Sequence, residues 1–244
     1  ESHTFKEIGQ MGLEMLGAVG EAQVQQAVRL AAQSLAQLGA AWVLEVSHMG
    51  YLFGLFDALG VPENARPGLL EKLREKNAHE LRRAAQAAGL DAAGADALTG
   101  LLELSGSCEE TLTKAESACR NDRMRAAAAE LRALAKTLEA SGGAVRLDLS
   151  LAGEMEYYNG LVFQGYLQGL PRPLLKGGRY DLLMQKFTPG AGAIGFAVYL
   201  DELDRLSAPL PPVQKNSTDR VMLNVALPKG RLGDKVYNLL AGIG

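Results

Sequence analysis

Residues 149–206 read LSLAGEMEYYNGLVFQGYLQGLPRPLLKGGRYDLLMQKFTPGAGAIGFAVYLDELDRL, and this stretch carries the clearest fold signal in the chain. It holds most of the tyrosines, a GGRYD segment and an apolar run punctuated by glycine. Glycine lets a backbone approach another group closely. We therefore expect this stretch to surround a small molecule as well as to contribute to a core.

Strands dominate the structure that this region predicts. Apolar runs at residues 161–167 and 193–198 predict two strands, and residues 145–149 predict a third that pairs with 161–167 through the intervening EMEYYNG. The segment LLKGGRYD predicts a strand, a tight turn and the start of a short helix, and residues 199–206 predict a further helix. The expected fold is α+β, a mainly antiparallel sheet edged by helices.

The first strand is expected within residues 5–17, FKEIGQMGLEMLG, where apolar and polar residues alternate. Side chains two apart on a strand share a face. Gln10, Gly12 and Glu14 therefore point the same way, either toward a ligand or as a polar edge that faces solvent.

Most of the chain between these strands has a helical pattern. Residues 21–38 predict an amphipathic helix, 42–46 a short strand, and 51–140 a set of short packed helices. Ser107 and Glu110 have the spacing of a capping box that opens one of these helices. A later helix is predicted from an apolar stripe at Met124, Ala128, Leu131, Leu134 and Leu138.

Composition narrows the functional classes. A net charge of -3 and a pI near 5.7 give no general attraction to nucleic acid. The two cysteines, Cys108 and Cys119, have neither a CxxC spacing nor a His cluster, so we expect no disulfide framework and no metal site. No apolar stretch reaches the roughly 18 residues of a membrane helix. A cytoplasmic protein without a membrane or nucleic-acid partner is predicted.

No catalytic pair stands out among the polar residues. The histidines are scattered, and the charges between residues 72 and 83 alternate in sign, which is typical of a solvated helix face. Glu154 and Glu156 would share one face of a strand, where a polar face is the simpler interpretation. Tyr157 and Tyr158 are more unusual, because adjacent phenols at a strand end place one ring in the core and one toward a ligand.

Together these motifs resemble a known family. GQMGLE, EYYNGLVF, GGRYDLL and AIGFAVYLDEL occur in the order of the class II histidyl-tRNA synthetase core, which reads QxGxE, RGLDYYTGxVF, GGRYDxL and a Gly-Phe-Ala run ending in arginine. The resemblance covers residues 5–206. It implies a histidine-binding pocket, because an amide, carboxylates and phenols can hydrogen-bond an imidazole and an amino group. The implied pocket residues are Gln10, Glu14, Glu156, Tyr157, Tyr158 and Tyr180.

Two departures from that family bear on function. The position of the synthetase's catalytic arginine falls on Gly153, and the position of its ATP-binding arginine falls on Glu202. Cations at these positions offset phosphate charge during adenylate formation. Their replacement predicts a histidine pocket without an activation site, a combination that resembles the regulatory subunits of ATP phosphoribosyltransferase.

This second resemblance implies partners and a domain organisation. The expected partners are histidine and the short catalytic subunit in the first step of histidine biosynthesis, with a homodimer inside a hetero-oligomer and no cofactor. Residues 1–206 form a synthetase-like core that lacks its N-terminal part, and 207–219 form a Pro-rich linker. Residues 220–244 resemble the start of a truncated catalytic subunit, whose nucleotide and phosphoribosyl loop would include Lys229 and Arg231.

Two alternatives remain open on the sequence. A divergent or truncated histidyl-tRNA synthetase would retain histidine-dependent pyrophosphate exchange. A histidine-sensing module with a different partner would purify without the transferase. The tail favours the regulatory subunit, because a synthetase should continue into an anticodon-binding domain.

Overall fold

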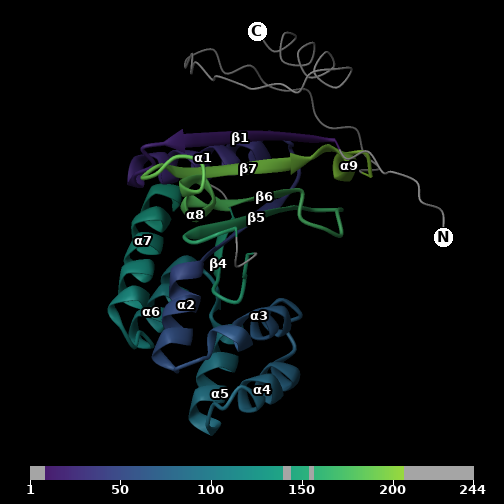
Figure 1. Ribbon diagram of the computed structural model, residues 1–244. Coiled ribbons are helices and arrows are strands. Elements are labelled where there is room, and N and C mark those ends of the chain that lie inside the picture. Colours follow the sequence, from purple (N-terminus) through teal and green to yellow (C-terminus); the bar gives the residue numbers. More distant parts are fainter. Residues whose placement is uncertain (1–8, 140–143, 154–156, 206–244) are drawn as a thin grey trace, which may run out of the picture.

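The computed structural model describes residues 9–139, 144–153 and 157–205, and these form one sheet with helices around it (Figure 1). The sheet has seven strands in the order β1-β7-β6-β5-β2-β4-β3, and every neighbouring pair is antiparallel except β2 with β4. The predicted α+β architecture is confirmed. The strands are β1 (Gln10–Gly17), β2 (Trp42–His48), β3 (Ser105–Gly106), β4 (Val145–Asp148), β5 (Leu161–Leu167), β6 (Leu175–Arg179) and β7 (Gly192–Tyr199).

The predicted pairing of residues 145–149 with 161–167 is wrong. β2 lies between β4 and β5, pairing antiparallel with β5 from Trp42↔Leu167 to His48↔Leu161 and parallel with β4 at Leu44↔Val145. Strands that are consecutive in sequence are neighbours in a sheet only roughly two-thirds of the time. β4 and β5 are one of the exceptions. The segment between β4 and β5 therefore connects strands that are not adjacent, instead of closing a hairpin.

The glycines of GGRYD lie in a strand and not in the predicted turn. β6 includes both Gly177 and Gly178. A Cβ atom on Gly177 would lie 2.5 Å from the Gly195 carbonyl oxygen, and one on Gly178 would lie 2.5 Å from the Tyr158 ring. These glycines therefore serve close approach by a neighbouring strand and an aromatic ring.

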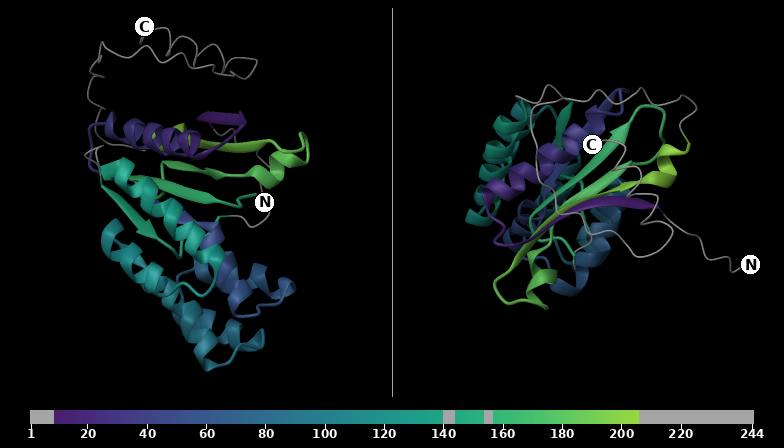
Figure 2. Two further views of the ribbon diagram at one scale, coloured as in Figure 1. Left: turned by 90° about the vertical axis from the view of Figure 1, so that its left-hand side faces the viewer. Right: turned by 90° about the horizontal axis from the view of Figure 1, so that it is seen from above.

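Helices cover one side of the sheet and extend beyond its β4 end (Figures 1 and 2). α1 buries a stripe that repeats at helical spacing and packs on β5 and β7, while α7 packs on α2 and β2. A separate group, α3–α5, lies at the end of the molecule opposite β1 (Figure 1). The helices are α1 (Glu21–Ala36), α2 (Met49–Ala58), α3 (Arg66–Arg74), α4 (Ala78–Ala87), α5 (Ala92–Thr99), α6 (Cys108–Ser117), α7 (Asp122–Glu139), α8 (Asp181–Gln185) and α9 (Leu200–Leu203).

Two helix ends differ from the predictions. Ser107 is the N-cap of α6 but its side chain makes no capping hydrogen bond, so the predicted capping box is absent. α9 ends at Leu203, shorter than predicted. The stripe predicted for α7 is confirmed, because all five of its apolar residues are buried.

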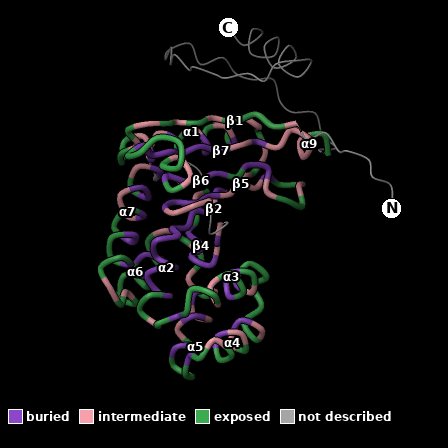
Figure 3. The backbone as a smooth tube through the Cα atoms, in the orientation of Figure 1, coloured by how far each residue is buried: buried purple, intermediate pink, exposed green. Residues whose placement is uncertain are grey.

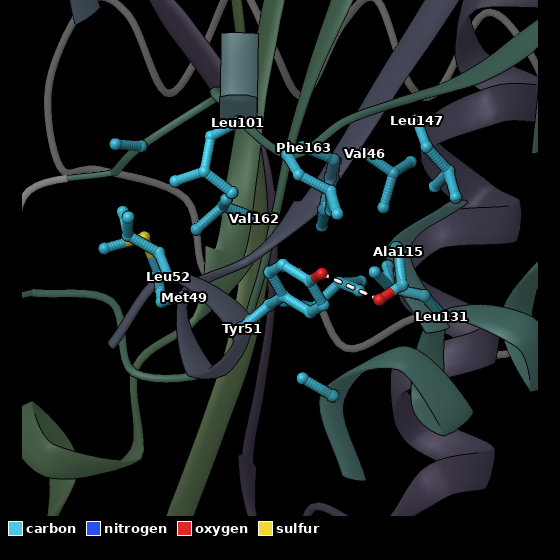
Figure 4. Packing of buried hydrophobic residues seen from close by; sticks show 14 of the residues in the cluster. Val46, Met49, Tyr51, Leu52, Leu101, Ala115, Leu131, Leu147, Val162 and Phe163 are labelled. Atoms are coloured by element: carbon cyan, nitrogen blue, oxygen red, sulfur yellow. Dashed lines mark hydrogen bonds between the residues drawn. The ribbon is translucent and has the colours of Figure 1, made fainter. Parts of the chain in front are cut away.

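The core lies between the sheet and α1, α2 and α7, and it continues through α6 and the group α3–α5 (Figure 3). Tyr51 of α2 is 1% exposed, and its hydroxyl donates a 2.8 Å hydrogen bond to the Ala115 carbonyl of α6 (Figure 4). Val46, Leu147 and Phe163 of three neighbouring strands are buried in the same cluster. A buried hydroxyl with a partner contributes about 1 kcal/mol, whereas one without a partner costs more. In the described part of the chain, no helix is long and apolar enough to cross a membrane.

Candidate functional site

A cavity of about 680 Å³ lies on the sheet face opposite α1. Strand register explains its floor. Ala197, Lys176, Gln164 and Glu45 are successive cross-strand partners, so they share one face of the sheet, and all four line the cavity. Residues 150–153 and the tyrosines at 157 and 158 add further lining. The stretch 149–206 thus contributes to a cavity, as expected.

Glu14 and Tyr180 form the polar centre of one half of this cavity. The Tyr180 hydroxyl donates a hydrogen bond to Glu14 Oε2, and the carboxylate lies over Gly195, where a Cβ atom would collide with it. Desolvation by burial raises the pKa of Glu14 even though the Tyr180 hydrogen bond opposes that shift. Burial and the same hydrogen bond raise the pKa of Tyr180. Burial therefore favours the uncharged form of both groups, and the pair can make hydrogen bonds to a polar ligand.

Three tyrosine rings pack around that centre. Tyr157 stacks on Tyr180 with ring centroids 4.9 Å apart, and its edge meets Tyr158 at 4.7 Å. Tyr158 lies against Gly178 and also against Gly153, where a Cβ atom would approach its ring to 2.6 Å. Offset-stacked and edge-to-face contacts are the geometries that aromatic rings prefer, because of their quadrupoles. The result is an aromatic wall suited to a small planar ligand.

Hydrogen bonds fix the chain on both sides of Tyr180. The Arg179 guanidinium donates to Asp181 Oδ2 at 2.7 Å and to the Val19 carbonyl at 3.1 Å. Asp181 in turn accepts from the Ala193 amide at 2.9 Å, while its own amide donates to Asn159 Oδ1. Tyr180 is only 8% exposed. These contacts hold its ring in place before any ligand binds.

The other half of the cavity is charged, and its residues are not among those predicted from the sequence. Asp148, which is 2% exposed, accepts hydrogen bonds from Lys76 Nζ at 2.5 Å and from the Ser150 hydroxyl at 2.5 Å. Burial, followed by repulsion from Asp148, raises the pKa of Glu45. Burial and nearby carboxylates raise the pKa of Tyr166 to about 12. No local pattern marks these residues, because they come from three strands and two connecting segments.

Arg74 closes the cavity beside Gly153. Its Nη2 donates to the Gly153 carbonyl at 2.6 Å and its Nε donates to the Ala152 carbonyl at 3.2 Å. The alternating charges between residues 72 and 83 predict a solvated helix face. That interpretation is incomplete, because Arg74 and Lys76, although exposed, also line the cavity.

The structure brings together five of the predicted pocket residues, Gln10, Glu14, Tyr157, Tyr158 and Tyr180. Glu156, Lys229 and Arg231 lie outside the described residues. Glu202 does not line the cavity; its Oε2 has no hydrogen-bond partner among the described residues and lies 3.5 Å from Arg205 Nη1. In residues 9–139, 144–153 and 157–205, no cluster of three His, Cys, Asp or Glu side chains could hold a metal.

This sheet, with its cavity opposite α1, has the fold of a class II aminoacyl-tRNA synthetase. The chain superposes on the solved structure of an ATP phosphoribosyltransferase regulatory subunit/histidyl-tRNA synthetase from Bacillus halodurans with a TM-score of 0.73 and 31% identity, covering 82% of this chain and 53% of that one. The family model described as histidyl-tRNA synthetase matches residues 1–203. The chain belongs to that family.

The relatives found by sequence have a more specific name than the family model. The ATP phosphoribosyltransferase regulatory subunit of Desulfitobacterium hafniense is 33% identical over 198 residues, which cover 80% of this chain and 51% of that protein. The protein of the same name from Bacillus licheniformis is 32% identical over 252 residues, covering 98% of this chain and 63% of the relative. The chain therefore spans about half to two thirds of the length of these relatives.

Proposed function

We propose that the chain is part of a regulatory subunit of ATP phosphoribosyltransferase that has no catalysis of its own and acts in the cytoplasm, in the first step of histidine biosynthesis. Its partners would be histidine and the short catalytic subunit, within a hetero-oligomer that contains a dimer of this subunit. Relatives with that name at 32–33% identity support the proposal.

One observation carries the proposal: five of the expected pocket residues line one cavity, whereas no arginine stands at Gly153. Glu14, Tyr180 and the tyrosine wall are assembled, whereas Gly153 brings no side chain to the position of the family's catalytic arginine. A Cβ atom at Gly153 would press into Tyr158. Removing one donor that stabilises transition-state charge typically lowers a rate by about 10² to 10³. The cavity is thus suited to recognition without adenylate formation.

The proposed histidine lies with its imidazole between Glu14 and the tyrosine rings. A carboxylate accepts from a ring N–H, while phenol hydroxyls can donate or accept as the tautomer requires. Gln10 at the cavity rim would contact the polar end of the ligand. Glu156 is included in the proposed pocket only because it lies in the sequence motif that resembles the family.

Titration calorimetry tests the pocket directly. Glu14→Gln and Tyr158→Phe should each weaken histidine binding by about 1 to 3 kcal/mol, because each leaves a polar group of the ligand without its partner. Glu110→Gln is the matched control, since Glu110 is exposed on α6 and lines no described cavity. Unchanged affinity in both pocket variants would remove the site assignment.

Reconstitution tests the function and its main alternative. The intact protein should raise the activity or the histidine sensitivity of a short catalytic subunit, and it should catalyse no histidine-dependent pyrophosphate exchange. The family model favours a divergent synthetase as the second candidate. Exchange activity without any effect on the transferase would establish that candidate instead.

The proposal also covers the C-terminal tail, for which it rests on sequence resemblance alone. Residues 220–244 would begin a catalytic subunit, with Lys229 and Arg231 in its nucleotide and phosphoribosyl loop. The Bacillus licheniformis relative, which aligns with 98% of the chain, offers the other assignment, a continuation of the regulatory subunit. The DNA that follows codon 244 distinguishes the two.

A further inference from the structure

We propose that Arg74, from the helical group α3–α5, binds the α-carboxylate of the amino-acid ligand and so replaces the cation that Gly153 lacks. This inference rests on the proposed function, because it assumes that the ligand is an amino acid whose ring lies at Glu14 and Tyr180. It assigns a ligand contact to a helix outside the sheet motifs from which the pocket was predicted.

The position of the guanidinium is the first argument. Arg74 Nη2 lies 2.6 Å from the carbonyl of Gly153, the residue that occupies the position of the family's arginine. Gly153 in turn contacts the Tyr158 ring, which belongs to the tyrosine wall. A positive charge therefore stands next to the gap in the pocket, although it comes from a residue 79 positions earlier in the chain.

Free donor capacity is the second argument. A guanidinium has five N–H donors, and the Arg74 group uses its Nε and one Nη2 hydrogen on the carbonyls of Ala152 and Gly153. Among the described residues, no carboxylate forms an ion pair with it, and its side chain lines the cavity. The two carbonyl contacts fix the orientation of the planar guanidinium group. Its remaining N–H donors can hydrogen-bond a carboxylate.

The other cations of the cavity fit this role less well. Lys76 is already paired with Asp148 at 2.5 Å. Lys176 has no ion-pair partner among the described residues, but its place on the β6 floor gives it a single mobile ammonium without a fixed orientation. Of the three cations that line the cavity in the described part of the chain, Arg74 combines available donors with an orientation fixed by backbone contacts.

Comparing two ligands tests the inference with the full chain. L-histidine and histamine share the imidazole and the amine, but histamine lacks the carboxylate. Arg74→Met should weaken L-histidine binding about 10- to 100-fold, the range for a hydrogen bond to a charged group, and leave histamine binding within twofold. Arg74→Lys should give a smaller selective loss and serves as the comparison if Arg74→Met does not fold. Arg83→Met is the matched control, because Arg83 is exposed on α4 and lines no described cavity, and it should alter neither affinity. Lys176→Met tests the other cation of the cavity floor.

Each outcome bears on one claim. Equal weakening of both ligands would show that Arg74 only braces the segment at 152–153, and no weakening would show that it makes no contact; either overturns the inference while leaving the proposed pocket in place. A selective loss in Lys176→Met would transfer the role to Lys176. Failure of the unaltered protein to bind either ligand would overturn the proposed function and this inference together.

Discussion

The glycines of the sheet and those of α3–α5 have opposite surroundings. Added Cβ atoms at Gly177 and Gly195 would lie within 2.5 Å of neighbouring atoms, whereas Gly68 and Gly89 have nothing within 4 Å. In the sheet, glycine makes room for an adjacent strand or for a cavity side chain such as that of Glu14. In α3, Gly68 fills no such role, although Gly94 of α5 does lie close to Asp91 and Leu90. Added atoms are therefore not tolerated at Gly177 and Gly195 of the sheet, whereas the surface of α3 at Gly68 has room for them.

The largest effect is expected from Gly177→Ala. The new methyl group would collide with the Gly195 carbonyl and with the Phe163 ring, both at 2.5 Å. Overpacking of a rigid interior costs about 3 kcal/mol at its upper range, and the shift of β6 against β7 should also weaken ligand binding. Urea denaturation measures the loss of stability. A loss below about 0.5 kcal/mol, the range of ordinary surface changes, would show that the sheet can relax and would break the comparison.

A smaller effect of opposite sign is expected from Gly68→Ala in α3. Nothing lies within 4 Å of the added methyl group, and alanine favours a helix over glycine by about 0.5 to 1 kcal/mol. The same denaturation experiment should therefore show a gain in stability, with histidine affinity unchanged. A loss of stability would show that α3 does not tolerate the added methyl group and would break the comparison.

Local patterns predicted the elements well. Period-two alternation placed Gln10 and Glu14 on one strand face, and both line the cavity. Helical spacing identified α1 and α7 with the correct buried faces. These signals succeed because an amphipathic element has to bury one face in any fold.

Features that depend on distant partners were not predictable in this way. The GGRYD glycines fit a turn or a tightly packed strand equally well, and only the nearness of Gly195 and Tyr158 decides between them. Lys76 reaches the cavity because it adopts φ 52° after α3, a left-handed conformation that its sequence neighbours do not indicate. Arg74 resembled any surface arginine, since its partners at 152 and 153 lie far along the chain.

The pairing of β1 with β7 has a consequence for synthesis of the protein. β1 forms the edge of the sheet and takes its only described partner from residues Gly192–Tyr199, about 180 positions later. At translation rates of about 5 to 20 residues per second, β1 waits on the order of 10 to 40 seconds before β7 has been made. During that interval Met11 and Leu16 have no strand to pair with. The nascent chain therefore carries β1 as a strand without its partner until β7 has been made, and a chaperone that binds short extended segments would protect it in that interval.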